Sequence, residues 1–165
     1  MTSPNVGRQA IEFLLERGRL ERIDGSTALE SANLILSRAA RRLLTAEGGV
    51  AAGDYAGAFV ASYDAYRMAA ESLLLCQGLR ATGGEGSHMT VEDAISGQYS
   101  SAIASFAKPT FERFRRTRHA AQYFDPSVPE ISEDDAHWAL STAHRVVDAV
   151  REVLATDAPP LFSSG

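Results

Sequence analysis

The sequence contains little that would direct the chain into a membrane, a secretory route or a disulfide-bonded fold. Its single cysteine, Cys76, excludes an internal disulfide and suits a reducing compartment, so we expect a cytoplasmic protein. No apolar run reaches the roughly 20 residues that a membrane-spanning helix needs, and we expect no membrane partner. Residues Met1 to Pro4 lack the basic and apolar segments of a signal peptide.

Lysine is nearly absent, because Lys108 stands alone beside fifteen arginines. The net charge of −5 means that the overall field of the protein repels nucleic acid, and any contact with it requires a local cationic patch. The length of 165 residues and the hydrophobic content of 45% suit a single globular domain with its own core. We predict that this domain spans residues 1–158 and that residues 159–165 form a flexible tail.

Apolar residues recur at helical spacing through most of the chain, and no segment shows the period of two that is typical of a strand. Gly48-Gly49 and Gly78 are predicted to end helices, whereas Thr27, Asp54 and Ser132 are predicted to cap the starts of others. The expected helices are about 6–17, 27–47, 55–77, 90–99, 109–124 and 132–154, with a further turn or two within 100–107. The sequence therefore predicts an all-α helical bundle.

Residues 111–124 carry the most distinctive pattern, because four arginines and a histidine lie within residues 113–119. On a helix, one apolar stripe is expected to face inward: Phe114, Thr117, Ala121 and Phe124. The other side then carries Arg115, Arg116, His119, Gln122 and Tyr123, with Arg113 and Arg118 at the margins. Guanidinium groups match the geometry of phosphate and carboxylate, so this face is a candidate anion site. The plainer alternative is a solvated arginine face without a ligand.

The remaining reactive side chains form no recognisable catalytic or metal-binding motif. His137 and His144 share a face of the last helix, but a di-metal bundle needs a second acidic-x-x-His pair, and we expect neither a metal nor a cofactor. Cys76 follows three leucines and is predicted to be a core residue. The glycine-rich segment 81–88 lacks the features of a nucleotide loop and is predicted to connect two helices. Tyr63 and Tyr66 are expected in the core or at the edge of an interface.

Two segments together resemble a known family. The first is Tyr63-Asp-Ala-Tyr-Arg-Met-Ala-Ala-Glu-Ser-Leu-Leu-Leu-Cys-Gln-Gly-Leu-Arg80, followed by a glycine-rich loop. The second is Arg113-Phe-Arg-Arg-Thr-Arg-His-Ala-Ala-Gln-Tyr123, followed by a capped final helix. This order is similar to the HEPN domain of prokaryotic toxin and nucleotidyltransferase systems and of RNA-processing enzymes. The resemblance implies an antiparallel four- to five-helix bundle that pairs as a homodimer, with residues 6–47 as an N-terminal extension of a core at about 52–154.

In catalytic HEPN members, an arginine, a polar residue and a histidine from both subunits meet at the dimer cleft and cleave RNA without a metal. The arginine stabilises charge on phosphorus and the histidine transfers a proton. Arg113 and His119 fit the family spacing, although Phe114 occupies the polar position. Alignment on Tyr123 instead places Arg116 at the arginine position and Ala121 at the histidine position, so that His119 would have to act from a turn away.

The hypothesis from the sequence is that the arginine helix binds RNA or a nucleotide phosphate, and whether the RNA is also cleaved stays open. The candidate catalytic residues are Arg116 and His119. The candidate phosphate-binding residues are Arg113, Arg115, Arg118 and Tyr123. An alternative is a non-catalytic interaction module, for example a toxin–antitoxin or nucleotidyltransferase partner, and a third possibility keeps the arginines purely structural. For RNA binding, we predict a steep dependence on salt and a loss in Arg116→Ala.

Overall fold

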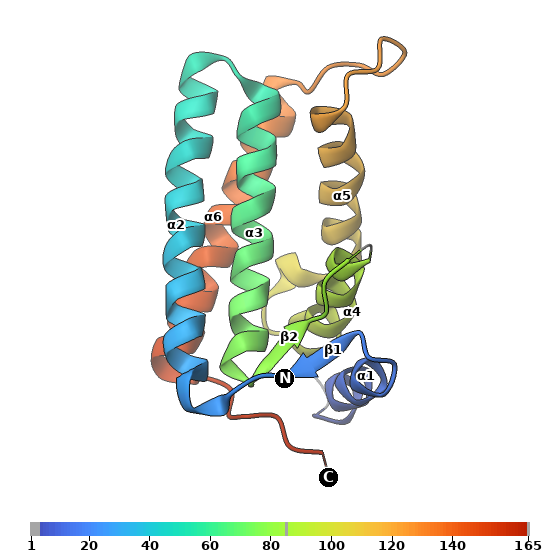
Figure 1. Cartoon of the computed structure of the whole chain (residues 1–165). Coiled ribbons are helices and arrows are strands. Elements are labelled where there is room, and N and C mark those ends of the chain that lie inside the picture. The colour runs from blue at the N-terminus through green and yellow to red at the C-terminus, as the bar shows by residue number, and fades with distance from the viewer. Residues whose placement is uncertain (1–3, 85, 165) are drawn as a thin grey trace.

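The computed structural model describes residues 4–84 and 86–164, and within them the chain forms six α-helices and one two-stranded sheet (Figure 1). The helices are α1 (Pro4–Glu16), α2 (Ala28–Ala52), α3 (Tyr55–Cys76), α4 (Ser87–Tyr99), α5 (Lys108–Gln122) and α6 (Glu133–Thr156). The strands are β1 (Leu20–Arg22) and β2 (Leu79–Ala81), and 3-10 turns lie at η1 (Gly25–Thr27) and η2 (Ala104–Phe106). The predicted all-α fold is confirmed. The six helices are one more than the upper limit of the four- to five-helix bundle that the family resemblance implies.

Helix α3 is the centre of the molecule. Helices α2, α5 and α6 run alongside it, while α1, α4 and the small sheet pack towards one end (Figure 1). Because α3 has neighbours on several sides, it buries residues around most of its circumference, including Phe59, Tyr63, Tyr66 and Leu73. The prediction that Cys76 is a core residue is confirmed, since this residue is buried at the end of α3.

Local capping signals placed several helix ends correctly. Asp54 accepts a hydrogen bond of 2.9 Å from the backbone N–H of Gly57 at the start of α3. Ser132 and Asp135 form the reciprocal capping box at the start of α6. Gly78 follows α3 with a φ of +71°, a conformation that glycine adopts without strain.

The prediction that Gly48-Gly49 ends the second helix is wrong, because α2 continues through both residues to Ala52. The reason is tertiary packing. A Cβ built on Gly49 would lie 3.0 Å from the Cβ and 3.1 Å from the backbone nitrogen of Ala58, so this glycine lets α2 approach α3 closely. Thr27, predicted to cap α2 through its side chain, makes no such hydrogen bond.

These two neighbouring glycines predict opposite effects on stability. Gly48→Ala is expected to raise the free energy of unfolding by about 0.5–1 kcal/mol, because alanine favours the helix and its Cβ meets nothing within 4 Å. The free energy of unfolding of Gly49→Ala is expected to be about 1–3 kcal/mol lower than that of Gly48→Ala, because the new Cβ meets the backbone of α3. Urea unfolding midpoints measure both variants, and an equal stabilisation by the two would contradict this packing.

The sheet was not predicted from the sequence, because strands of three residues are too short to show a period of two. Leu20 pairs with Ala81 and Arg22 with Leu79 in antiparallel register. The pairing joins the segment after α1 to the segment after α3, and it thereby sets where the following glycine-rich loop starts. The chain then turns into α4, which begins at Ser87 and not at the predicted Thr90.

Two further sets of contacts were not predicted from the sequence. Thr90 is buried inside α4, where its hydroxyl accepts a hydrogen bond of 3.1 Å from Arg19 Nε of the segment before β1. The segment 159–164, which lies within the predicted flexible tail, returns across the base of the bundle. There the backbone N–H of Phe162 donates to the carbonyl of Gln77 at 2.9 Å, and the thiol of Cys76 donates to the carbonyl of Pro159 at 3.3 Å.

Candidate phosphate-binding cleft

The orientation of α5 is set by two buried aromatic side chains. Phe111 and Phe114 lie with their ring centroids 4.9 Å and 4.5 Å from that of Tyr66 on α3. Phe114 also lies 4.7 Å from the ring of Trp138 on α6. These contacts hold one face of α5 against the core, as the sequence predicts for Phe114. The prediction for Phe124 is wrong: this residue is 86% exposed, because the helix ends at Gln122 and the chain becomes extended at Tyr123.

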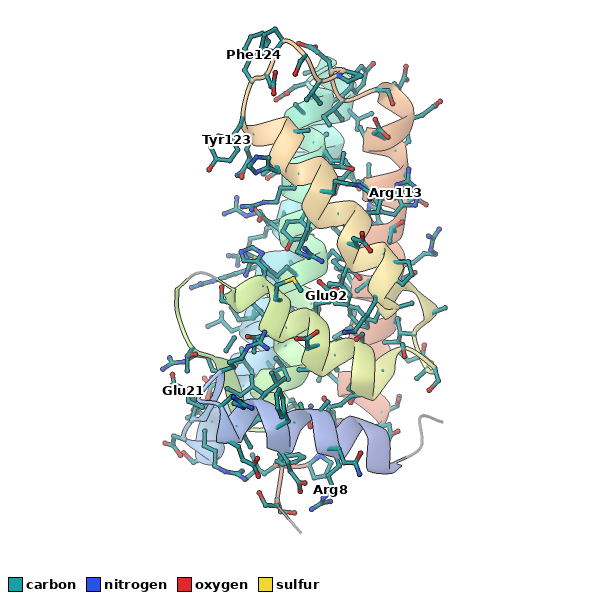
Figure 2. The ribbon with its side chains drawn as sticks, turned by 90° about the vertical axis from the view of Figure 1, so that its right-hand side faces the viewer. Arg8, Glu21, Glu92, Arg113, Tyr123 and Phe124 are labelled. Carbon is teal, nitrogen blue, oxygen red and sulfur yellow. The ribbon has the colours of Figure 1, made fainter. Side chains whose placement is uncertain are left out.

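With that face fixed, the arginines of α5 point in different directions. Arg113 faces α6, where its guanidinium lies 3.7 Å from the ring centroid of Trp138. Arg116 faces outward: its side chain is 73% exposed and pairs with Glu112 one turn earlier at 3.7 Å. Neither residue lines the cavity on the other flank of α5. Figure 2 shows Arg113 and Tyr123 on opposite sides of this helix.

On that other flank, α5 borders a cavity of about 270 Å³, which we call the α5 cleft. Helix α5 supplies most of its wall, α3 supplies Tyr63, and α4 supplies His88. The lining residues are Tyr63, His88, Arg115, Arg118, His119, Gln122 and Tyr123. The structure thus brings together four of the site residues predicted from the sequence, namely Arg115, Arg118, His119 and Tyr123.

The two arginines of the α5 cleft differ in their partners. Arg115 Nε donates to Glu92 Oε2 of α4 at 2.8 Å, and the side chain of Glu92 is only 4% exposed. Arg118 has no ion pair or hydrogen bond within the described part of the chain, and its buried Nε lacks a partner. The guanidinium of Arg118 lies 5.2 Å from the ring centroid of Tyr63. The cleft therefore contains one neutralised and one unneutralised guanidinium group.

Tyr63 and His88 form the floor of the cleft as a hydrogen-bonded pair. Tyr63 Oη lies 2.6 Å from His88 Nδ1, and the two rings stack with centroids 5.7 Å apart and planes inclined by 9°. Burial raises the pKa of Tyr63 to about 12, so its hydroxyl keeps the proton at neutral pH. Burial, together with the charges of Arg67 and Arg118, lowers the pKa of His88 below 6.5, so this imidazole is neutral at pH 7.

Sequence reasoning missed both residues of this pair. Tyr63 was predicted as a core residue, and the structure does bury it, but its hydroxyl edge reaches the cleft. His88 was placed in the glycine-rich loop, whereas it belongs to the first turn of α4. Their proximity depends on how that loop returns the chain to α3, and no local motif encodes this.

Comparison with protein families identifies the family of this chain. A family model described as the HEPN domain matches residues 32–153, which is most of the chain. The protein belongs to the HEPN family. No curated protein and no solved structure matched the chain significantly.

The HEPN motif can now be followed in three dimensions. In the first register, Arg113 faces α6 while His119 lines the α5 cleft, so a single subunit does not bring this pair together. In the second register, Arg116 lies outside the cleft and pairs with Glu112. The arginines that share a cleft with His119 are Arg115 and Arg118.

Membrane-spanning helices and clusters of metal ligands are absent from residues 4–84 and 86–164 of this HEPN protein. No helix there is long and apolar enough to cross a membrane. In the same residues, no three side chains of His, Cys, Asp or Glu gather closely enough to hold a metal ion.

Proposed function

We propose that this HEPN protein binds single-stranded RNA, with one phosphate group seated in the α5 cleft. The observation that carries the proposal is Arg118, whose guanidinium borders the cleft without any anionic partner among the described residues. A cationic guanidinium whose buried N–H donor lacks an acceptor is unfavourable until an anion binds. A phosphate supplies both the charge and the acceptor oxygens that the arginine fork matches.

The surroundings of Arg118 favour a nucleic acid over a free anion. His119 and Tyr123 lie at the mouth of the cleft with their rings 4.9 Å apart, and Tyr123 is 62% exposed. Exposed aromatic rings beside a cationic groove stack on the bases of single strands. The cavity of about 270 Å³ is at the small end for a ligand pocket, so we infer that it takes the phosphate while the base lies outside on Tyr123.

The test is the binding of a short single-stranded RNA with 2′-O-methyl riboses, which cannot be cleaved through the ribose hydroxyl. Fluorescence anisotropy between about 50 and 200 mM salt should show affinity that falls with a log–log slope of about −0.7 for each phosphate contacted. We expect a slope that corresponds to one or two contacts, because the protein carries a net charge of −5. Absence of binding, or affinity that does not change with salt, would exclude the proposal.

A second candidate is a pairing module, and one observation favours it. Exposed apolar side chains gather after α5, where Tyr123, Phe124 and Val128 are 62%, 86% and 43% exposed. A second copy of the chain would bury them, as the HEPN resemblance implies for a homodimer. The RNA titration separates the two candidates, because a pairing module would form dimers in sedimentation analysis and yet leave the RNA unbound.

A further inference from the structure

Tyr63 and His88, which form the floor of the α5 cleft, share one hydrogen bond whose direction can reverse. Tyr63 Oη lies 2.6 Å from His88 Nδ1 and makes no other hydrogen bond within the described part of the chain. Because Tyr63 is buried and its hydroxyl keeps the proton, that hydrogen needs an acceptor, and the neutral His88 ring supplies one at Nδ1. In the neutral pair the tyrosine therefore donates, and the ring hydrogen of His88 lies on Nε2.

Protonation of His88 reverses this hydrogen bond. A protonated imidazole carries hydrogen on both nitrogens, so Nδ1–H must donate to Tyr63 Oη and the tyrosine hydrogen must turn away. Few groups of the cleft can receive that hydrogen: Arg115 and Arg118 have donors only, and the described lining residues include no carboxylate. A phosphate oxygen would be a charged acceptor, to which hydroxyl groups form their stronger hydrogen bonds.

The charges around His88 oppose its protonation. The charged groups that face it from the neighbouring helices are Arg67 and Asp64 of α3 and Arg115 and Arg118 of α5. On its own helix, Glu92 is neutralised by its pair with Arg115, and the first turn of α4 adds the positive end of the helix dipole. Burial and these cations together lower the pKa of His88.

A phosphate bound by Arg118 would remove both obstacles. Arg118 is the arginine of the cleft that has no anionic partner in the described chain, and its guanidinium lies 5.2 Å from the Tyr63 ring. The cavity of about 270 Å³ is small, so an anion inside it lies close to His88 as well. Its charge favours the protonated imidazole, and its oxygens accept the hydrogen that Tyr63 turns away.

We propose that phosphate binding in the α5 cleft is coupled to protonation of His88, with the Tyr63 hydroxyl turning from the imidazole to the phosphate. This proposal rests on the proposed function, since it needs a phosphate at Arg118. The proton comes from the solvent and binds at His88 Nδ1, and the Tyr63 hydroxyl stays intact. The coupling is reciprocal, because protonation strengthens phosphate binding by the same factor as phosphate binding strengthens protonation.

This coupling fixes the sign of the pH dependence. A phosphate adds a negative charge near His88, so the pKa of this residue is higher in the complex than in the free protein, where it lies below 6.5. Between these two pKa values, binding takes up one proton, and the affinity falls as the pH rises by at most about tenfold per pH unit. Outside this window the affinity is constant.

The direct test is an NMR titration of the wild-type protein, which contains four histidines. The ligand is a 2′-O-methyl oligouridylate without a terminal phosphate, because its charge stays constant between about pH 5 and 8, where histidine titrates. The imidazole resonance of His88, assigned with the variant His88→Gln, should titrate at a higher pH with the RNA bound than without it. An unchanged midpoint, or one at lower pH, would overturn the proposal.

A second test measures RNA affinity in a His119→Gln background, where His88 is the one histidine left among the described lining residues. In this variant, the affinity should rise by about threefold to tenfold for each unit by which the pH falls within the window. Adding His88→Gln should make the affinity independent of pH. The matched control is His137→Gln, exposed on α6, which should follow the wild type. Dependence on pH that survives in the double variant, or that is already lost in His119→Gln, contradicts the assignment.

Tyr63→Phe tests the role of the hydroxyl, because it keeps the ring that packs 5.6 Å from Phe114. Where His88 is protonated, this variant should bind the RNA about tenfold more weakly than the wild type, since a donor to the phosphate is lost. Above the window the hydroxyl donates to His88 instead, so we expect a change of less than about threefold. A purely structural role would weaken binding equally at every pH, and that result would refute the turn of the hydroxyl.

The outcomes also separate this inference from the proposed function. A wild type that binds the 2′-O-methyl RNA equally well at every pH, with the titration of His88 unmoved, overturns the inference and leaves the proposed function standing. A wild type that binds no RNA at any pH overturns both.

Discussion

Replacing Phe114 with alanine is expected to lower the free energy of unfolding by about 3–5 kcal/mol, a large part of the 5–15 kcal/mol typical of a domain. Phe114 is fully buried and is the hub of the aromatic cluster, with its ring 4.5 Å from Tyr66, 4.7 Å from Trp138 and 5.7 Å from Phe59. Removing the ring leaves a cavity between α3, α5 and α6, which these helices could fill only by moving closer together. Urea unfolding followed by circular dichroism measures the loss.

The matched control for this prediction is Phe114→Leu. Leucine keeps most of the buried volume, so we expect it to lower the stability by no more than about 1.5 kcal/mol. The same experiment reports on the cleft, because the Phe114 ring also lies 5.6 Å from Tyr63 and so supports its floor. If Phe114→Ala unfolds at the wild-type midpoint, α5 is not anchored to α3 as described.

Arg118→Gln is expected to weaken the binding of 2′-O-methyl RNA by about tenfold to a hundredfold, which corresponds to a charged hydrogen bond of about 1.5–3 kcal/mol. The salt slope should become shallower by about 0.7, because one phosphate contact is lost. The physical reason is that Arg118 supplies the unneutralised guanidinium of the cleft, whereas the charge of Arg115 is neutralised by Glu92. Anisotropy titrations at several salt concentrations measure both quantities.

Arg116→Gln provides the control for charge. It lies on the same helix and loses the same single positive charge, but it is 73% exposed and outside the cleft, so we expect a change of at most about threefold. Arg118→Lys separates charge from geometry: it should keep the salt slope but recover only part of the affinity, because lysine lacks the planar fork. If Arg116→Gln and Arg118→Gln weakened RNA binding equally, the cause would be a non-specific effect of charge. That result would contradict phosphate binding in the α5 cleft.

How far the sequence predicted the fold depended on how local each signal was. The caps at Asp54 and Ser132 and the glycine after α3 were predicted correctly, because side chains within three or four residues determine those ends. Gly49 was misjudged because its role is the close approach of α3, which the local sequence does not contain. The sheet was missed for the same reason, because its two strands pair residues that lie about 60 positions apart in the sequence.

The candidate site shows the same division between local and tertiary information. The arginine cluster on α5 and His119 stand out in the sequence, so the helix that lines the cleft could be found from composition alone. Which arginine enters the cleft could not, because that depends on the Phe111 and Phe114 anchors and on α4, which supplies Glu92 and His88. The sequence favoured Arg116 for the central role, and the geometry leads us to propose Arg118 instead.

The most direct measurement is the crystal structure of the protein with a short 2′-O-methyl RNA bound. We predict a phosphate oxygen at about 2.7–2.9 Å from a guanidinium nitrogen of Arg118, with a base stacked on Tyr123. A phosphate bound instead at the exposed arginines of α2, Arg38, Arg41 and Arg42, with the α5 cleft empty, would contradict it.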